Sequence, residues 1–301
     1  MPRKKVHSFS DVRYPYREKY LTLNSGMKIC YIDKGMGTPL VFVHGMGGDL
    51  SNFTYNYKHF KRDFRVIGLD LPGYGKSGRQ KTDYTIEYYA AVLEEFLGKL
   101  SVDKCILIGN SLGGHISAVY ALNDQSRVEK LILVDSAGLT KLSPVLETMV
   151  KFTLNTTVIK MSPMTLVNQG LKNNFHDTDL KECKEWLDNI ANISANDEEY
   201  ENYCHSIKCS MKTMLQSRID HEIGKLDIPV LLVWGKYDCM VPLNYAYQFK
   251  SKVKNSKLVI IDDAGHMPML EKYSAFNKIM EEFIMANRKN FFIRIKEILF
   301  D

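Results

Sequence analysis

Six short apolar runs constrain the fold of this chain more than any other feature of its sequence. They occupy residues 40–43, 64–70, 105–108, 131–134, 230–234 and 258–261. The runs are mostly continuous and aliphatic rather than alternating, which is typical of strands buried on both faces of a parallel sheet. Amphipathic segments such as 86–97 lie between them, and an antiparallel hairpin is expected around Asn24-Ser25-Gly26. This alternation predicts an α/β fold with a mostly parallel central sheet flanked by helices.

The alternation stops between Gly138 and about His221, where no strand-like run occurs. The pattern there favours helices at 144–154, 163–171, 180–190 and 198–215. Because the two flanking halves need each other to complete one sheet, we interpret this stretch as an all-helical cap insertion. The predicted core is residues 1–138 and 222–301, and the predicted cap is residues 139–221.

Composition and charge exclude several classes of protein. Hydrophobic residues make up 45% of the 301 residues and charged residues 25%, the balance of a globular protein. The net charge of +5 is concentrated in residues 1–20 and 288–301, so we expect no nucleic-acid partner. No apolar stretch approaches the length of a membrane span, and the basic start lacks the apolar region of a secretory signal. The six cysteines form no C-x-x-C pair. We therefore expect a cytoplasmic protein with no metal site.

The strongest chemical signal is Gly109-Asn110-Ser111-Leu112-Gly113-Gly114, which follows a predicted strand and precedes a helix-like stretch. A nucleophile elbow requires this strand–turn–helix context, because it exposes the serine at the tip of a strained turn. The neighbouring glycines allow the strand and the helix to approach closely. We therefore predict that Ser111 is a catalytic nucleophile.

An acid and a histidine follow in the order that this elbow predicts. Asp238 comes just after the run 230–234, and His266 comes just after the run 258–261. The carboxyl ends of parallel strands share one edge of a sheet, so these side chains can converge with Ser111. His266 is predicted to be the general base and Asp238 the residue that orients it. Asp135, also at a strand end, is the alternative acid.

The loop His44-Gly45-Met46-Gly47-Gly48 follows the first apolar run. A glycine-rich turn at this place can direct backbone N–H groups at a developing oxyanion. The predicted donors are the amides of Met46 and Leu112, and His44 is interpreted as structural. Gly45, Asn110 and Met267 flank these groups in the sequence and are predicted to contact the substrate.

Together these motifs resemble the α/β-hydrolase superfamily over about residues 20–287. The resemblance rests on His44-Gly45, Asp70-Leu-Pro-Gly-Tyr-Gly-Lys-Ser77, the elbow, Asp238 with Val241-Pro242, and Gly265-His266. It implies a capped serine hydrolase that forms an acyl-enzyme intermediate and needs no cofactor.

Two substrate classes, and one role without catalysis, remain open. The Gly-Asn-Ser-x-Gly-Gly form is similar to carbon–carbon bond hydrolases of ring-cleavage (dienol diketone) products, which usually have a Trp after the histidine and an arginine in the cap. Met267 follows His266 here, and residues 139–217 contain no arginine. We therefore favour a carboxylic ester with a hydrophobic acyl or alcohol part. A non-catalytic receptor for a small ligand is the third hypothesis.

The C-terminal stretch 290–301 extends beyond the last helix usual in this superfamily. Its apolar residues could form one face of an amphipathic helix, with the charged residues Arg294, Lys296 and Glu297 on the opposite face. Docking on the chain's own core or on a second subunit is favoured for this tail. Contact with a membrane surface is the alternative.

Overall fold

The computed structural model describes residues 8–139, 169–190 and 197–300, with side chains as far as residue 286 in the last helix. The strands are β1 (Lys19–Thr22), β2 (Lys28–Lys34), β3 (Pro39–Val43), β4 (Arg65–Leu69), β5 (Cys105–Asn110), β6 (Val128–Val134), β7 (Val230–Gly235) and β8 (Ser256–Ile261). The helices are α1 (Thr54–Phe60), α2 (Ile86–Lys99), α3 (Leu112–Asn123), α7 (Lys181–Ile190), α8 (Asp197–Gln216), α9 (Asn244–Lys252), α10 (Pro268–Glu271) and α11 (Tyr273–Phe300). Short 3-10 helices occupy Phe9–Asp11, Leu50–Phe53, Gln125–Arg127 and Ile223–Lys225.

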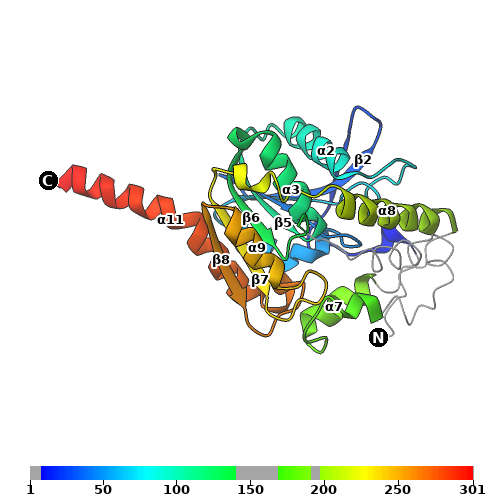
Figure 1. The fold of residues 1–301 in the computed structure, drawn as a ribbon. Helices are drawn as coiled ribbons and strands as arrows, with labels where there is room; N and C mark the ends of the chain where they lie inside the picture. Colours follow the sequence, from blue (N-terminus) through cyan, green and yellow to red (C-terminus); the bar gives the residue numbers. More distant parts are fainter. Residues whose placement is uncertain (1–7, 140–168, 191–196, 301) are drawn as a thin grey trace.

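One sheet of eight strands forms the centre of the molecule, in the order β1-β2-β4-β3-β5-β6-β7-β8 (Figure 1). β1 and β2 pair antiparallel, as do β2 and β4, and every later pair is parallel. The hairpin turn places Gly26 at a φ of 81°, a conformation that glycine adopts without strain. The predicted mostly parallel α/β sheet with a leading hairpin is therefore confirmed.

The central strands are continuous apolar runs because both of their faces are covered. Along β3, Val41 and Val43 belong to one core cluster, which α2, α3 and α9 cover. Leu40 and Phe42 point the other way into a second cluster, which α1, α10 and α11 cover. β8 differs from this pattern, since several of its side chains are half-exposed. Its predicted burial on both faces was wrong, because β8 lies at the edge of the sheet and, among the residues that the structure describes, pairs with β7 alone.

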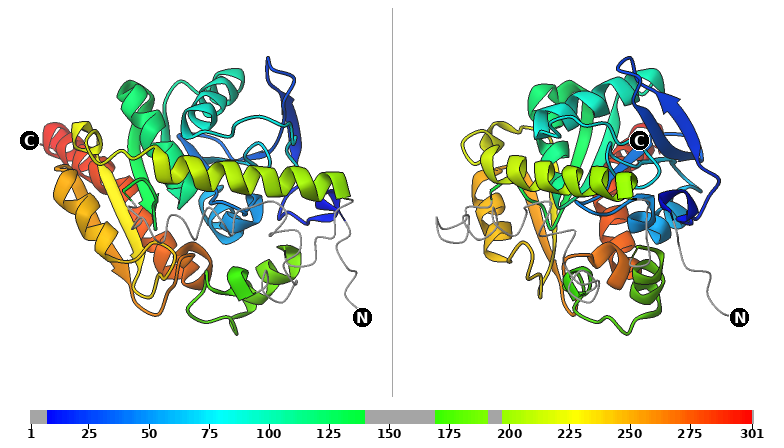
Figure 2. Two further views of the ribbon diagram at one scale, coloured as in Figure 1. Left: turned by 45° about the vertical axis from the view of Figure 1, so that its right-hand side comes forward. Right: turned by 90° about the vertical axis from the view of Figure 1, so that its right-hand side faces the viewer.

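The chain leaves the carboxyl end of β6 and returns at β7, the neighbouring strand, after the segment that holds α7 and α8. α8 runs beside α2 and α3 (Figure 2). The hydroxyl of Thr213 on α8 accepts the backbone N–H of Ile86, the first residue of α2, at 3.0 Å. The predicted helices 180–190 and 198–215 correspond to α7 and α8. Helix 144–154 and most of 163–171 lie outside the described residues, so the cap boundaries stay a prediction.

Residues ahead of β1 contact both α7 and α8. The backbone N–H of Arg13 donates to Asn189 Oδ1 at 3.0 Å, and Asn189 Nδ2 donates to the Arg13 carbonyl at 3.2 Å. The Phe9 ring lies 5.0 Å from the Tyr203 ring of α8. The guanidinium of Arg79 also lies over the Phe9 ring, at 3.7 Å from the ring centroid. This N-terminal segment therefore ties the two helices to the core.

Asp70 anchors the same segment from the end of β4. Its buried carboxylate accepts the Tyr14 hydroxyl at 2.6 Å and the backbone N–H groups of Leu50 and Lys76 at 2.8 Å each. Burial and the neighbouring Asp49 carboxylate raise the pKa of Asp70 to about 7. This carboxyl group therefore titrates much nearer neutral pH than an ordinary aspartate.

The last helix, α11, continues through Phe300 and extends away from the body of the molecule (Figure 1). Its side chains beyond residue 286 lie outside the description, so the two hypotheses for the tail 290–301 stay predictions. Across the described residues, we find no helix that combines the length and the apolar character needed to cross a bilayer.

Candidate active site

Ser111 stands in the turn between β5 and α3. Its φ of 55° and ψ of −117° are strained for a residue with a side chain, at a cost on the order of 1–3 kcal/mol. Glycine is required on both sides: a Cβ at Gly109 would collide with the backbone of Gly113, and a Cβ at Gly113 would collide with the carbonyl oxygens of Val43 and His44. The predicted strand–turn–helix elbow is therefore present, with Ser111 only 8% exposed.

Asp238 and His266 lie together at the same edge of the sheet. The distance from His266 Nδ1 to Asp238 Oδ2 is 2.8 Å, and both residues are almost completely buried. Asp238 Oδ1 accepts the backbone N–H groups of Met240 at 2.7 Å and Val241 at 3.0 Å. These bonds fix the orientation of the Asp238 carboxylate. When the His266 proton is on Nδ1 and is donated to this carboxylate, Nε2 is unprotonated and can act as a base.

Asn110 connects the elbow to the histidine loop. Its Nδ2 donates to the carbonyl of Val134 and to the carbonyl of His266, each at 3.2 Å. Among the described residues, Ser111 Oγ has no hydrogen-bond partner. In enzymes without substrate, the catalytic hydrogen bond of the nucleophile is often long and tightens only when substrate binds.

The loop after β3 runs against the elbow. A Cβ at Gly45 would lie 3.2 Å from Ser111 Cβ and 3.0 Å from Asn110 Oδ1, so glycine permits this approach. Both ring nitrogens of His44 contact the backbone, in agreement with its interpretation as a structural residue. Nδ1 lies 2.7 Å from the Gly45 carbonyl oxygen, and Nε2 accepts the N–H of Leu71 at 2.9 Å. Burial lowers the pKa of His44 to about 4, so the ring is neutral.

The remaining predicted site residues surround Ser111 and His266. Leu112 is buried at the first position of α3, and Met46 is half-buried against the core. The Met267 side chain is 2% exposed and packs in the second core cluster. The roles of Met46 and Leu112 in an oxyanion hole stay predictions. So do the substrate contacts predicted for Gly45, Asn110 and Met267.

Asp135, the alternative acid, lies beside this pair. It is fully buried, its φ is 44°, and its Oδ1 accepts the N–H of Gly235 at 2.9 Å. One side-chain atom from each of Asp135, Asp238 and His266 lies within 4.8 Å of the others. The imidazole is bonded to Asp238 rather than to Asp135. Because His266 Nδ1 already contacts Asp238 Oδ2 and two backbone amides already bond Asp238 Oδ1, we assign no metal to this cluster.

Glu271, on α10, was missed by the sequence reasoning. Its buried carboxylate accepts three backbone N–H groups, from His176 at 2.7 Å, Asp177 at 2.9 Å and Gly265 at 2.6 Å. Burial raises its pKa, although these amides act in the opposite direction. The signal that could have identified Glu271 was an acidic residue within the apolar stretch after His266. Its partners 94 and 95 residues earlier in the chain were not visible in the sequence.

Glu271 joins the histidine loop to the segment that precedes α7. The backbone N–H of His266 donates to the Asn174 carbonyl at 2.8 Å. A Cβ at Gly265 would lie 2.8 Å from the His176 nitrogen and 2.9 Å from the Phe175 carbonyl carbon. The close approach of these two backbones therefore depends on glycine at position 265.

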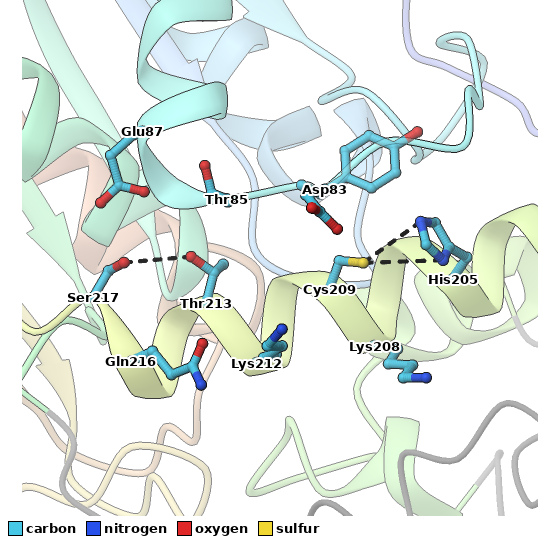
Figure 3. A pocket seen from close by; sticks show the side chains of 11 residues that line it. Asp83, Thr85, Glu87, His205, Lys208, Cys209, Lys212, Thr213, Gln216 and Ser217 are labelled. Atoms are coloured by element: carbon cyan, nitrogen blue, oxygen red, sulfur yellow. Dashed lines mark hydrogen bonds between the residues drawn. The ribbon is translucent and has the colours of Figure 1, made fainter.

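A separate pocket of about 350 Å³ lies between the start of α2 and α8 (Figure 3). It is lined by polar side chains, among them Asp83, His205 and Cys209. The Cys209 sulfur lies 3.5 Å from His205 Nε2. None of the predicted site residues lines this pocket, so it is distinct from the Ser111 elbow.

Comparison with known proteins decides the family. The sequence model of the alpha/beta hydrolase fold matches residues 38–273. The chain belongs to the α/β-hydrolase fold family. The family match and the hydrolase name of a relative confirm the sequence prediction that the chain is a hydrolase enzyme. Hydrolases of this family act on small molecules.

Relatives within the α/β-hydrolase family carry different names. A 2-hydroxy-6-oxononadienedioate/2-hydroxy-6-oxononatrienedioate hydrolase 1 from Pseudomonas putida is 28% identical over 278 residues, covering 88% of this chain and 96% of that protein. An esterase from Exiguobacterium antarcticum has a TM-score of 0.79 at 23% identity, covering 89% of this chain and 99% of that structure. A meta-cleavage product hydrolase from Pseudomonas fluorescens has a TM-score of 0.72 at 20% identity, covering 89% and 98%. The two structural likenesses show the shared fold alone.

Proposed function

We propose that the chain is a serine hydrolase that works through an acyl-enzyme intermediate. The observation that carries this proposal is the buried 2.8 Å contact between His266 Nδ1 and Asp238 Oδ2, next to a strained elbow that ends in Ser111. A serine hydroxyl is a weak nucleophile by itself, and an oriented imidazole corrects this by accepting its proton.

In the proposed mechanism, Ser111 Oγ attacks the substrate carbonyl carbon while His266 Nε2 accepts the hydroxyl proton. Asp238 remains ionised and stabilises the imidazolium. The backbone amides of Met46 and Leu112 donate to the oxyanion, and the N-terminus of α3 favours negative charge there. His266 then protonates the leaving group, and water, activated by the same imidazole, releases the acid.

We propose a carboxylic ester with a hydrophobic acyl or alcohol part as the substrate. Nine of the 14 methionines lie in the predicted cap or flank the predicted catalytic loops, and flexible thioethers suit an adaptable apolar pocket. Residues 139–217 contain no arginine, so that stretch offers no bidentate partner for a substrate carboxylate. An uncharged ester needs no such partner.

Cleavage of a carbon–carbon bond in a dienol diketone is the second candidate. The observation in its favour is the Pseudomonas putida relative, whose name specifies a hydrolase of such dienedioates and which spans nearly the whole chain. A lysine in place of the cap arginine would then bind the substrate carboxylate as a point charge.

We also propose that residues 139–221 form a cap over this site. The support is topological, because the segment leaves the sheet at the carboxyl end of β6, the edge where Ser111 and His266 lie. Contacts from the described part of the segment reach both catalytic loops: Asn174 bonds His266, and the Tyr203 hydroxyl lies 3.5 Å from the Gly47 carbonyl.

A fluorophosphonate probe tests the nucleophile. We expect covalent labelling of the wild-type chain at Ser111, found by peptide mapping, and no labelling of Ser111→Ala. Ser117→Ala is the matched control, because Ser117 is also a buried serine of the same region, bonded to the Gly113 carbonyl. Labelling of Ser111→Ala at the wild-type rate would refute the assignment.

A p-nitrophenyl ester series of increasing acyl length, measured beside a ring-cleavage product, tests the substrate. Efficient turnover of esters supports the first candidate, and efficient turnover of the dienol diketone alone supports the second. Tight retention of a ligand with negligible turnover of either class would indicate a receptor instead.

A further inference from the structure

Asp135 is a second buried carboxyl group beside the proposed catalytic acid, and one of its carboxylate oxygens lies within 4.8 Å of one of Asp238. It follows the last residue of β6, and its own backbone N–H donates to the Val233 carbonyl at 3.0 Å. The side chain is completely buried, and its φ of 44° is unfavourable for any residue with a Cβ. The fold therefore holds this carboxyl group in place against backbone strain.

The two oxygens of Asp135 have different surroundings. Oδ1 accepts the Gly235 N–H, whereas within the described part of the chain no donor reaches Oδ2. An ionised Asp135 would therefore hold a carboxylate oxygen without a protein donor in a completely buried site, beside the carboxylate of Asp238. Two buried carboxylates this close do not both ionise, because each charge disfavours the other.

The hydrogen bonds indicate which of the two carboxyl groups is ionised. Asp238 receives two backbone N–H groups and faces the His266 imidazole, all of which favour its charged form. Asp135 receives one backbone N–H. The shared proton therefore belongs on Asp135.

We propose that Asp135 is a neutral carboxylic acid in the folded enzyme, and that its Oδ2–H donates a hydrogen bond to the Asp238 carboxylate. Asp135 is then a positioning residue, which acts on His266 through Asp238. The proton stays on Asp135 throughout the reaction, while the Ser111 proton passes to His266 Nε2 and on to the leaving group. This role in catalysis rests on the proposed function.

The electrostatics agree with this geometry. Burial and the Asp238 carboxylate raise the pKa of Asp135 well above that of an ordinary aspartate. The titratable groups that face it are Asp238 after β7, His266 after β8 and Glu271 on α10. Above the ordinary aspartate range, the folded chain therefore retains a proton that the unfolded chain releases. The stability of the folded chain must therefore fall as the pH rises from the ordinary aspartate pKa toward the raised pKa of Asp135.

A comparison of Asp135→Asn with Asp135→Ala tests whether Asp135 acts as a neutral carboxylic acid or as an ionised carboxylate. The asparagine amide preserves both hydrogen bonds, as an acceptor for Gly235 and a donor to Asp238. We expect Asp135→Asn to lose less than about tenfold in kcat/KM and Asp135→Ala to lose about a hundredfold. Asp238→Asn, measured beside them, is expected to lose about 10⁴-fold in kcat. A fall of Asp135→Asn to the level of Asp238→Asn would show that Asp135 works as a charged group and would overturn the proposal.

Urea unfolding gives a readout that does not depend on activity or on the alanine variant. From about pH 4 upward, the unfolding equilibrium constant of wild type should rise relative to that of Asp135→Asn, by up to about tenfold per pH unit. A pH-independent ratio of the two unfolding equilibrium constants would overturn the proposal that Asp135 is neutral. Because this measurement needs no substrate, it stands even where fluorophosphonate labelling refutes Ser111 as the nucleophile.

Discussion

Glu271→Gln is the most informative single substitution outside the proposed catalytic residues. The carboxylate accepts three backbone N–H groups, two from the segment before α7 and one from Gly265, beside the proposed catalytic histidine. A glutamine offers one carbonyl oxygen and one amide nitrogen. Whichever way the amide is turned, at least one buried N–H faces another donor.

The expected cost follows from these bonds. A hydrogen bond to a charged group contributes about 1.5–3 kcal/mol, and a stranded buried donor costs about 1–3 kcal/mol. Together they predict a loss of about 3 kcal/mol in the free energy of unfolding, a large part of the ordinary total. At about 2 °C per kcal/mol for a chain of this size, Tm should fall by roughly 6 °C.

The same substitution should lower catalysis. Gly265 precedes His266 in the loop that Glu271 fixes, and displacement of a catalytic group by about 1 Å can cost about a hundredfold in rate. We expect kcat on the best ester to fall by about ten- to a hundredfold, with a smaller change in KM. Urea unfolding and steady-state kinetics measure the two effects.

Glu281→Gln is the control, because this carboxylate is exposed and has one 3.4 Å contact with His59. An exposed pair of this kind contributes about 0–1 kcal/mol. The reasoning is refuted by a Glu271→Gln variant whose stability equals that of Glu281→Gln. A variant that loses stability but keeps the wild-type kcat would show instead that the histidine loop does not depend on Glu271.

Three further predictions follow from other contacts. Asp238→Asn should lower kcat by about 10⁴-fold with an unchanged circular dichroism spectrum, and a loss below about tenfold would move the orienting role to Asp135. Gly265→Ala should lower stability by about 1–3 kcal/mol in urea unfolding, because its Cβ would press on the backbone around His176; a neutral effect would contradict this packing. Asp70 holds a proton up to about pH 7 in the folded chain, so its contribution to stability falls between about pH 4 and pH 7. Asp70→Asn should therefore show a shallower pH dependence than wild type over that range, and an equal slope would refute the shift.

The strands were predictable because the sheet buries both of their faces. In a run such as Leu40–Val43 every residue is apolar, as expected for a strand with no exposed face. The glycine-rich stretch that follows it marks the loop at the carboxyl end of the strand. β8 deviates because it lies at an edge, and its position in the order of strands is a property of the whole sheet. Local sequence does not contain that information.

The elbow was predictable for a similar reason, since its glycines are required by contacts a few residues away. The choice between Asp135 and Asp238 was harder, because both follow strands that end at one edge. In the structure the His266 ring is bonded to Asp238, which favours Asp238 for the proposed role. Glu271 was missed because its role depends on backbone amides nearly a hundred residues earlier in the chain.

The N-terminal segment has a consequence for the exchange of parts between related enzymes. Arg13 bonds Asn189 of α7, and Phe9 contacts both Arg79 of the core and Tyr203 of α8. The stretch around Phe9 thus contacts both the core and the helices of the proposed cap. A chimera that receives the insertion of a relative must also receive that relative's residues ahead of β1, or both will face surfaces that they do not fit.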